Sequence, residues 1–172
     1  MTLVLDGCDT DRETLRLLQA WVAWQNPKVV VEAGTYRGHG MLHLAQGLSA
    51  VRPEGRVYTA DLYEWGQTAL AEEYGLENTA IWLGDFDAML DTIEGPIDFG
   101  WIDSGPGSGQ YAEESGVRWR HWCAAKARVS PGGVLIAHDT AFTDWGGALE
   151  IVADGNLTLP FGRGLTFYQR PL

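Results

Sequence analysis

The chain has few basic residues for its length. Its 172 residues include 12 Lys and Arg against 23 Asp and Glu, which gives a formal net charge of −11. A protein that grips nucleic-acid phosphates without regard to sequence needs clustered Lys and Arg, and this chain contains no basic run. We therefore expect no nucleic-acid partner, and the charge favours a small or neutral substrate.

Cysteine and long apolar runs are also scarce. The two cysteines, Cys8 and Cys123, lie far apart, so neither a disulfide scaffold nor a cysteine metal site is expected. No apolar run approaches the ~20 residues that span a membrane. The N-terminus MTLVLDGCDT lacks the basic segment and apolar core of a signal peptide. These absences predict a cytoplasmic protein without a membrane partner.

The stretch that organises the chain is VVVEAGTYRGHG, residues 29–40. Its unbroken valines predict a strand that is buried on both faces. The strand ends at Glu32, glycines follow at Gly34 and Gly38, and helix-spaced apolar residues continue from Met41. Strand, acid, glycine turn and helix together predict a cofactor site at the carboxyl end of a parallel strand.

Strand-like and helix-like segments alternate along the chain. We predict strands over residues 28–32, 56–62, 79–83, 97–103, 134–138, 157–161 and 165–169, and helices over 11–24, from the glycine turn to 50, and over 66–74, 88–93, 111–128 and 145–153. The alternation indicates a single α/β domain over 1–172 with a leading helical segment, 1–26, and a mostly parallel sheet. Thr10 and Glu13 have the spacing of a capping box, and residues 130–133 predict a tight turn.

Acidic residues stand at or just after the ends of the predicted parallel strands: Glu32, Asp61, Asp85, Asp103 and Asp139. Asp61 lies 27 residues beyond Gly34, near the spacing at which an acid accepts hydrogen bonds from ribose hydroxyls. A nicotinamide oxidoreductase would instead need G-x-G-x-x-G, because its helix amides approach a pyrophosphate. Glu32 replaces the first of those glycines with a negative charge, which favours a cationic ligand such as S-adenosylmethionine.

At this point the chain resembles the class I S-adenosylmethionine-dependent methyltransferases over nearly its whole length. The E-x-G-x-x-x-G turn at Glu32 carries the resemblance. The segments IDFGWIDS and VSPGGVLIAHDT are similar to the small O-methyltransferase-like branch, which includes the catechol and caffeoyl-coenzyme A enzymes. The resemblance implies a Rossmann-like, doubly wound, seven-stranded sheet in the order 3-2-1-4-5-7-6, whose last strand is antiparallel.

The resemblance also implies roles for single residues. The methionine side of the cofactor would lie in a cradle of Glu32, Gly34, Thr35 and Gly38, near Asp103. Its ribose would bind Asp61, and its adenine would meet Leu62, Gly84, Asp85 and Phe86. A divalent ion, Mg²⁺ or another hard cation, would be held by Asp103, Asp139 and Thr140, although the family has Asn where Thr140 stands.

The coenzyme A enzymes carry a lysine soon after the fourth-strand acid, and here that region reads Ser104-Gly105-Pro106. The best candidate for a general base is therefore His138, beside Asp139, because an unperturbed histidine titrates near neutrality. His138, Asp103 and Asp139 form the predicted catalytic set. A structural role for His138 within the crevice is the alternative.

We expect a methyltransferase that methylates an oxygen of a small molecule by in-line displacement. An N-methyltransferase is a weaker alternative, because the D/N-P-P-Y signature is missing after the fourth strand. A methyltransferase-like module that binds cofactor or a partner without turnover is a second alternative. Because the chain is short for this fold, a homodimer in which the second subunit covers the site is also an expectation.

Overall fold

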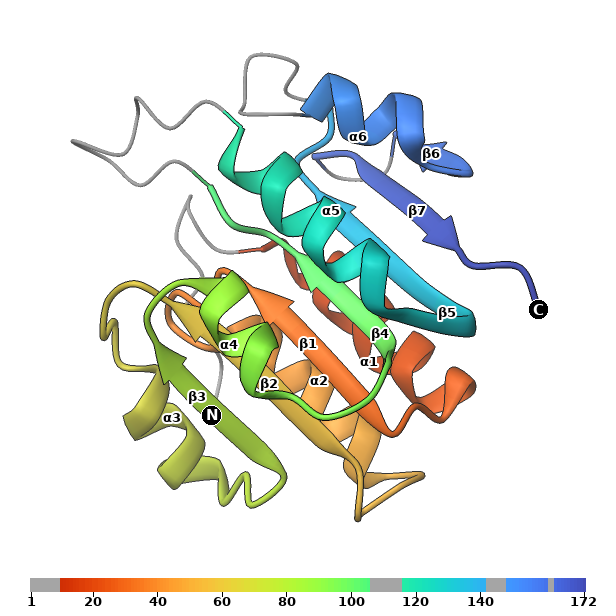
Figure 1. The fold of residues 1–172 in the computed structure, drawn as a ribbon. Coiled ribbons are helices and arrows are strands. Elements are labelled where there is room, and N and C mark those ends of the chain that lie inside the picture. Colours follow the sequence, from red (N-terminus) through yellow and green to blue (C-terminus); the bar gives the residue numbers. More distant parts are fainter. Residues whose placement is uncertain (1–9, 106–115, 142–147, 161–162) are drawn as a thin grey trace.

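The computed structural model describes residues 10–105, 116–141, 148–160 and 163–172, and it shows an α/β sandwich built on one sheet (Figure 1). The elements in chain order are α1 (Arg12–Gln25), β1 (Val29–Ala33), α2 (His39–Ser49), β2 (Arg56–Asp61), α3 (Gln67–Tyr74), β3 (Thr79–Leu83), α4 (Phe86–Thr92), β4 (Ile97–Ile102), α5 (Val117–Arg128), β5 (Val129–His138), α6 (Ala148–Asp154), β6 (Leu157–Leu159) and β7 (Leu165–Gln169). The predicted helices 111–128 and 145–153 have their first residues outside the described ranges. Cys8 also lies outside them.

The seven strands lie in the order β3-β2-β1-β4-β5-β7-β6. The pairs among β1 to β5 are parallel, whereas β7 runs antiparallel to both β5 and β6. Parallel neighbours need a crossover connection, but the short link from β6 to β7 allows only an antiparallel return. The predicted fold class and strand order are confirmed.

Helices cover both faces of the sheet, with α4 and α5 in front and α1 and α2 behind in Figure 1. The valine run of β1 serves both layers, because successive side chains of a strand point to opposite faces. Val31 packs with Trp122 of α5 on one side, and Val30 packs with Leu18 and Leu44 on the other. All five side chains are buried, which explains why the run has no polar break.

The start of α1 differs from the predicted capping box. Asp11 is the N-cap residue, and its carboxylate accepts hydrogen bonds from the backbone nitrogen and the hydroxyl of Thr14 at 2.9 and 2.8 Å. Thr10 instead donates its hydroxyl to Asp103 at 2.8 Å. A long-range partner therefore competes successfully for the hydroxyl that the local pattern assigned to the cap.

Two further boundaries differ from the prediction. Residues 130–133 lie inside β5, where the register jumps from Val129 opposite Ile97 to Val134 opposite Phe99. The expected turn is thus an irregularity within a longer strand. Helix α4 begins at Phe86, two residues early, because Asp85 caps it by accepting from the Asp87 backbone nitrogen at 2.9 Å.

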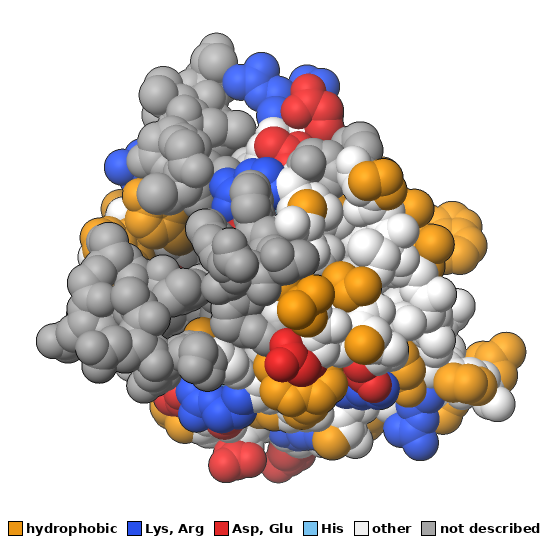
Figure 2. Space-filling model, turned by 90° about the horizontal axis from the view of Figure 1, so that it is seen from above, with side chains coloured by type: hydrophobic (Ala, Val, Ile, Leu, Met, Phe, Trp, Pro, Cys, Tyr) orange, Lys and Arg blue, Asp and Glu red, His pale blue; other side chains and the backbone are white. Residues whose placement is uncertain are grey.

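The surface is mixed in character. Seen from above in Figure 2, basic, acidic and hydrophobic side chains of the described residues are interspersed. Within the described part of the chain, none of the helices has both the length and the apolar character needed to traverse a membrane.

Candidate active site

The acids predicted at the strand ends lie along one edge of the sheet. The register places Ala33 of β1 beside Ala60 of β2 and Ile102 of β4, and places Ile102 beside Ala137 of β5. The residues that follow these positions therefore meet at the carboxyl ends of neighbouring parallel strands, which is where open α/β sheets bind ligands. The structure brings together the following predicted residues: Gly34, Thr35, Asp61, Asp103, His138 and Asp139.

The glycine turn after β1 requires glycine for steric reasons. Gly34 has φ +91°, and a Cβ there would lie 2.6 Å from the carbonyl oxygen of Asp103. The turn can therefore approach the end of β4 only without a side chain. Gly38, with φ +86°, is the N-cap of α2 and offers no side chain to the helix amides. The first-turn amides of a helix lack partners within the helix, so this end is suited to a carboxylate.

Glu32 lies beneath the turn rather than on its open side. It is 1% exposed, it accepts a short hydrogen bond from the hydroxyl of Thr59, and its Oε1 has no hydrogen-bond partner within the described residues. Burial raises the pKa of Glu32 to about 8, against the lowering effect of the Thr59 hydrogen bond. A Cβ on Gly40 would lie 2.1 Å from Oε1, so the carboxyl group sits under the first turn of α2. Thr35 lies in the same network through a short hydroxyl contact to Thr59.

Asp61 is held by donors from two segments. Its Oδ2 accepts from the backbone nitrogen of Tyr36 at 2.8 Å. Its Oδ1 accepts from the backbone nitrogen of Tyr63 at 3.1 Å and from the indole of Trp65 at 3.2 Å. The Trp65 ring contacts the rings of Tyr36 and Tyr63, with centroids 5.5 and 5.8 Å apart. The sequence did not predict these donors, which fix the carboxylate in an aromatic rim.

The predicted adenine side follows β2 and β3. Leu62 is 48% exposed and borders Asp61, and Gly84 donates its backbone N–H to the Asp61 carbonyl at 2.8 Å. Phe86 is buried in the core, where its ring packs 5.0 Å from that of His121. Leu62 is thus available to a ligand, and Phe86 supports the site from below.

Asp85 is engaged by an arginine of α5. Its Oδ2 accepts from Arg120 at 2.8 Å, and Arg120 also lies 3.3 Å from Asp87. Burial would raise the pKa of Asp85, but the hydrogen bonds from Arg120 and the Asp87 backbone and the charge of Arg120 together outweigh it, and the net shift is downward. Beside this pair, burial lowers the pKa of His121 to about 4, and its Nδ1 lies 2.9 Å from the Ser104 hydroxyl. His121 is therefore a neutral ring that links the Asp85 side to the end of β4.

His138 lies at the centre of the strand-end acids. Its Nδ1 is 3.1 Å from Oδ1 of Asp103 and 3.3 Å from Oδ1 of Asp139. Its Nε2 has no hydrogen-bond partner within the described residues; Oδ2 of Asp11 is 3.7 Å away. Burial lowers the pKa of His138, but the charge and hydrogen bond of Asp103 and the charge of Asp139 together outweigh burial, and the net shift is upward. The ring is therefore oriented by Nδ1, while Nε2 is buried on the side that faces Asp11.

Arg118 of α5 connects the ends of β4 and β5. Its side chain is 1% exposed. Its Nε donates a hydrogen bond to the carbonyl of Ser104, and its Nη1 donates one to the carbonyl of His138, both at 2.7 Å. Its Nη2 lies 4.0 Å from Asp103 and 3.7 Å from Asp139. Sequence analysis missed this residue. Its spacing to Trp122 and Ala125, four and seven positions on, matches the buried face of a helix and would have been the signal.

Asp139 is paired with a second arginine. Arg163 donates from Nε to Oδ1 at 2.6 Å and from Nη2 to Oδ2 in a shorter contact. Asp139 has φ +60°, and Thr140 beside it accepts a hydrogen bond from Thr166 at 3.0 Å. The sequence did not reveal Arg163, because the pairing joins the residue after β5 to the turn before β7, 24 positions along the chain.

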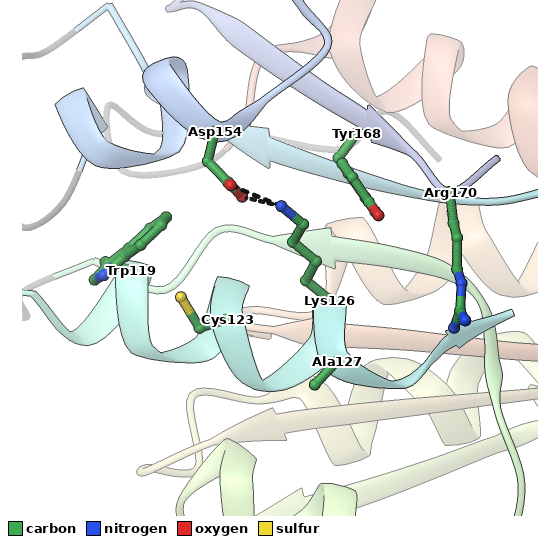
Figure 3. Close-up of a pocket in the computed structure, with 7 residues that line it drawn as sticks. All are labelled: Trp119, Cys123, Lys126, Ala127, Asp154, Tyr168 and Arg170. Carbon is green, nitrogen blue, oxygen red and sulfur yellow. Dashed lines mark hydrogen bonds and ion pairs between the residues drawn. The ribbon is translucent and has the colours of Figure 1, made fainter.

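An open pocket of about 530 Å³ lies away from these residues, over α5, α6 and β7 (Figure 3). It is lined by Trp119, Cys123, Lys126, Ala127, Asp154, Tyr168 and Arg170. Lys126 is held by Asp154 at 2.6 Å and lies 4.3 Å from the centre of the Tyr168 ring. Its charge is thus already balanced, and none of the predicted site residues lines this pocket.

Comparisons with solved structures show the same fold. A methyltransferase from Geobacter sulfurreducens has a TM-score of 0.75 at 17% identity, over 96% of this chain and 81% of that one. The O-methyltransferase TomG from Streptomyces achromogenes, solved with S-adenosylmethionine, gives 0.75 at 16%, over 98% and 84%. An O-methyltransferase from Bacillus cereus, in complex with S-adenosylhomocysteine, gives 0.73 at 19%, over 96% and 84%.

The sequence was also compared with curated proteins and with models of protein families. No curated protein matches the chain significantly. The family described as methyltransferase domain matches residues 31–140, which extend from β1 to the residue after Asp139 and so include the glycine turn, Asp61 and Asp103. The chain therefore belongs to the methyltransferase domain family, and it shares its fold with solved methyltransferases.

Proposed function

We propose that this protein transfers the methyl group of S-adenosylmethionine to an oxygen of a small molecule. The observation that carries the proposal is the His138 ring, which is fixed by Asp103 at Nδ1 and without a hydrogen-bond partner at Nε2 within the described residues. A base in this state, at the strand ends beside the glycine turn, suits the deprotonation of a hydroxyl group.

The cofactor would bind along the edge of the sheet. Its methionine carboxylate would face the first-turn amides of α2 across the turn at Gly34 and Gly38. Its ribose hydroxyls would donate to Asp61, whose carboxylate is already oriented. The adenine would lie against the exposed Leu62, with the amino group toward Asp85. The buried carboxyl group of Glu32 would support the turn from below, through its hydrogen bond with Thr59.

The chemistry follows from these positions. The acceptor hydroxyl gives its proton to Nε2 of His138, while Asp103 holds the Nδ1 proton and stabilises the imidazolium that forms. Bound S-adenosylmethionine would supply an activated methyl group to that oxygen: an O–C bond would form in line as the S–C bond breaks, with its electron pair left on sulfur in S-adenosylhomocysteine. His138 would then pass its proton to solvent after the products have left. The sulfonium is intrinsically reactive, so the protein chiefly supplies proximity and deprotonation.

The test is a calorimetric titration with S-adenosylmethionine and S-adenosylhomocysteine, followed by methyl transfer to a panel of phenols, catechols and amines. We expect binding of both ligands and transfer to oxygen, with transfer lost in His138→Gln but retained in His43→Gln, a control histidine on α2 that contacts Gln19. Absence of cofactor binding would sink the proposal. Binding without transfer to any acceptor would favour the non-catalytic module, and transfer only to amines would favour the N-methyltransferase.

A further inference from the structure

We propose that the guanidinium groups of Arg118 and Arg163 take the place of a divalent cation between Asp103 and Asp139. The catechol-type resemblance implies such an ion on these two acids and Thr140. The contacts of the described residues do not fit it, because each of the three implied ligands is already bound to a donor of this chain.

Both carboxylate oxygens of Asp139 are already engaged in this arrangement. Arg163 binds both of its carboxylate oxygens through two guanidinium nitrogens, which is the bidentate geometry that makes arginine–carboxylate pairs strong. Asp139 is 1% exposed, so solvent does not weaken this pair. A cation at this carboxylate would have to compete with a guanidinium group that is already matched to it in shape and charge.

Asp103 is occupied in the same way by neutral and cationic donors. Its Oδ2 accepts from the Thr10 hydroxyl at 2.8 Å. Its Oδ1 faces His138 at 3.1 Å and Arg118 at 4.0 Å. Mg²⁺ binds oxygen ligands at about 2.0–2.1 Å and requires a near-octahedral shell. An ion held between Asp103 and Asp139 would share that space with Arg118, whose Nη2 lies within 4.0 Å of both carboxylates, and the two positive charges would repel each other in a buried site.

The charges of Asp103, Asp139, Arg118 and Arg163 balance one another without a metal ion. The two buried carboxylates of Asp103 and Asp139 face the two guanidinium groups of Arg118 and Arg163. A buried charge is tolerated when it is paired and hydrogen-bonded, and each of these four groups meets that condition. A divalent ion added to this set would leave two uncompensated positive charges.

Arg118 also holds two strand ends together, as an ion shared by the two acids would do. An ion bound to both acids would tie the end of β4 to the end of β5. Arg118 does so through the backbone, because it donates to the Ser104 carbonyl after β4 and to the His138 carbonyl at the end of β5. The strand ends are therefore fixed before any ligand arrives.

One consequence concerns the acceptor and rests on the proposed function. A metal ion selects vicinal diols, because two neighbouring oxygens can bind it together. Without the ion, a hydroxyl has to reach only the base, so acceptors with a single acidic hydroxyl, such as monophenols, should react as readily as catechols. EDTA should leave the rate with both acceptor types unchanged.

The central claim is tested by ion binding, with Mn²⁺ as the probe. The full chain is treated with EDTA, desalted and titrated with Mn²⁺ while free Mn²⁺ is followed by electron paramagnetic resonance. We expect wild type to show no saturable site up to about 1 mM. Arg163→Gln, which frees Asp139, should gain a Mn²⁺ site with a dissociation constant at least about tenfold below that 1 mM limit. Adding Asp139→Asn to this variant should remove the site. Arg52→Gln is the charge control, since Arg52 pairs with Glu54 on the surface.

Two results would overturn the proposal. One is saturable Mn²⁺ binding by wild type that Asp139→Asn abolishes. The other is an Arg163→Gln chain, folded by circular dichroism, that binds no more Mn²⁺ than wild type. If Arg163→Gln does not fold, the wild-type titration alone decides. The titration does not use the cofactor, so a failure of S-adenosylmethionine to bind would count against the proposed function and leave this result standing.

Discussion

Nδ1 of His138 lies 3.1 Å from Oδ1 of Asp103, across the gap between the ends of β5 and β4. The charge and hydrogen bond of Asp103, together with the charge of Asp139, outweigh the effect of burial, so the pKa of His138 is raised above its ordinary value. The ring accepts a substrate proton only when it is neutral. The rate should therefore rise with pH through a midpoint above the ordinary histidine value.

The first prediction is that His138→Gln lowers kcat by about 10²-fold or more, with cofactor affinity retained, and abolishes the rising limb of the pH–rate profile. Asp103→Asn should keep a rising limb but move its midpoint to lower pH, because it removes the charge that raises the pKa of His138. Kinetics over a range of pH would check both. A profile in Asp103→Asn identical to that of wild type would contradict the pairing.

The second prediction concerns Glu32 and stability. Because burial raises its folded pKa from 4.5 to about 8, the folded state binds more protons than the unfolded state between these values. Stability from this group is therefore complete below about pH 4.5 and is lost as pH rises to about 8. Glu32→Gln should match wild type at pH 5 and exceed it by about 2–5 kcal/mol at pH 8.5.

Urea unfolding at both pH values measures this difference. The control is Glu94→Gln, an exposed residue after α4, whose substitution should change stability by no more than about 0.5 kcal/mol at either pH. A Glu32→Gln advantage that is the same at pH 5 and pH 8.5 would show that the carboxyl group does not change its charge on burial.

The third prediction compares neighbouring arginines of α5. Arg118 is buried and holds two carbonyls and two acids, so Arg118→Met should cost about 3–5 kcal/mol of unfolding free energy. Arg120 is half-exposed and pairs with Asp85 and Asp87, so Arg120→Met should cost only about 0.2–1 kcal/mol. Equal losses of unfolding free energy in urea would show that Arg118 does not stabilise the ends of β4 and β5.

The fourth prediction concerns the ribose acid. Asp61→Asn should weaken S-adenosylhomocysteine binding by about 10–100-fold, since hydrogen bonds to a charged acceptor contribute about 1.5–3 kcal/mol. Titration calorimetry measures the change. Asp91→Asn, at an exposed position of α4, removes the same charge far from the strand ends and should leave affinity unchanged. Full affinity in Asp61→Asn would place the ribose elsewhere.

The fifth prediction separates close approach from backbone strain at two glycines with positive φ. Gly75 has φ +60° and open space where a Cβ would stand, whereas a Cβ on Gly34 would lie 2.6 Å from the Asp103 carbonyl. Gly75→Ala should cost about 1–2 kcal/mol. Gly34→Ala should cost more and also reduce cofactor binding, because the turn must move away from β4. Thermal unfolding and calorimetry would show whether binding is lost in Gly34→Ala alone.

The sequence was informative where local pattern and strand direction suffice. The valines of β1, the glycines at Gly34 and Gly38, and the acids at the strand ends follow from periodicity and from the rule that ligands bind at the carboxyl ends of parallel strands. The strand order came from the resemblance on those same residues, and the structure confirmed it. The Thr10 cap failed because Asp103, 93 residues away, binds that hydroxyl.

The sequence by itself thus determined the individual strands of the parallel core, the glycine turn and the set of acids at the strand ends, because each depends on residues close together in the chain. Only the tertiary structure decided the charge state and partners of those acids. Arg118 and Arg163 approach Asp103 and Asp139 from α5 and from the turn before β7, and Glu32 is buried under α2. Partners of this kind depend on how distant elements pack, and that packing decides whether a strand-end carboxylate meets a metal ion, a ligand or a guanidinium group.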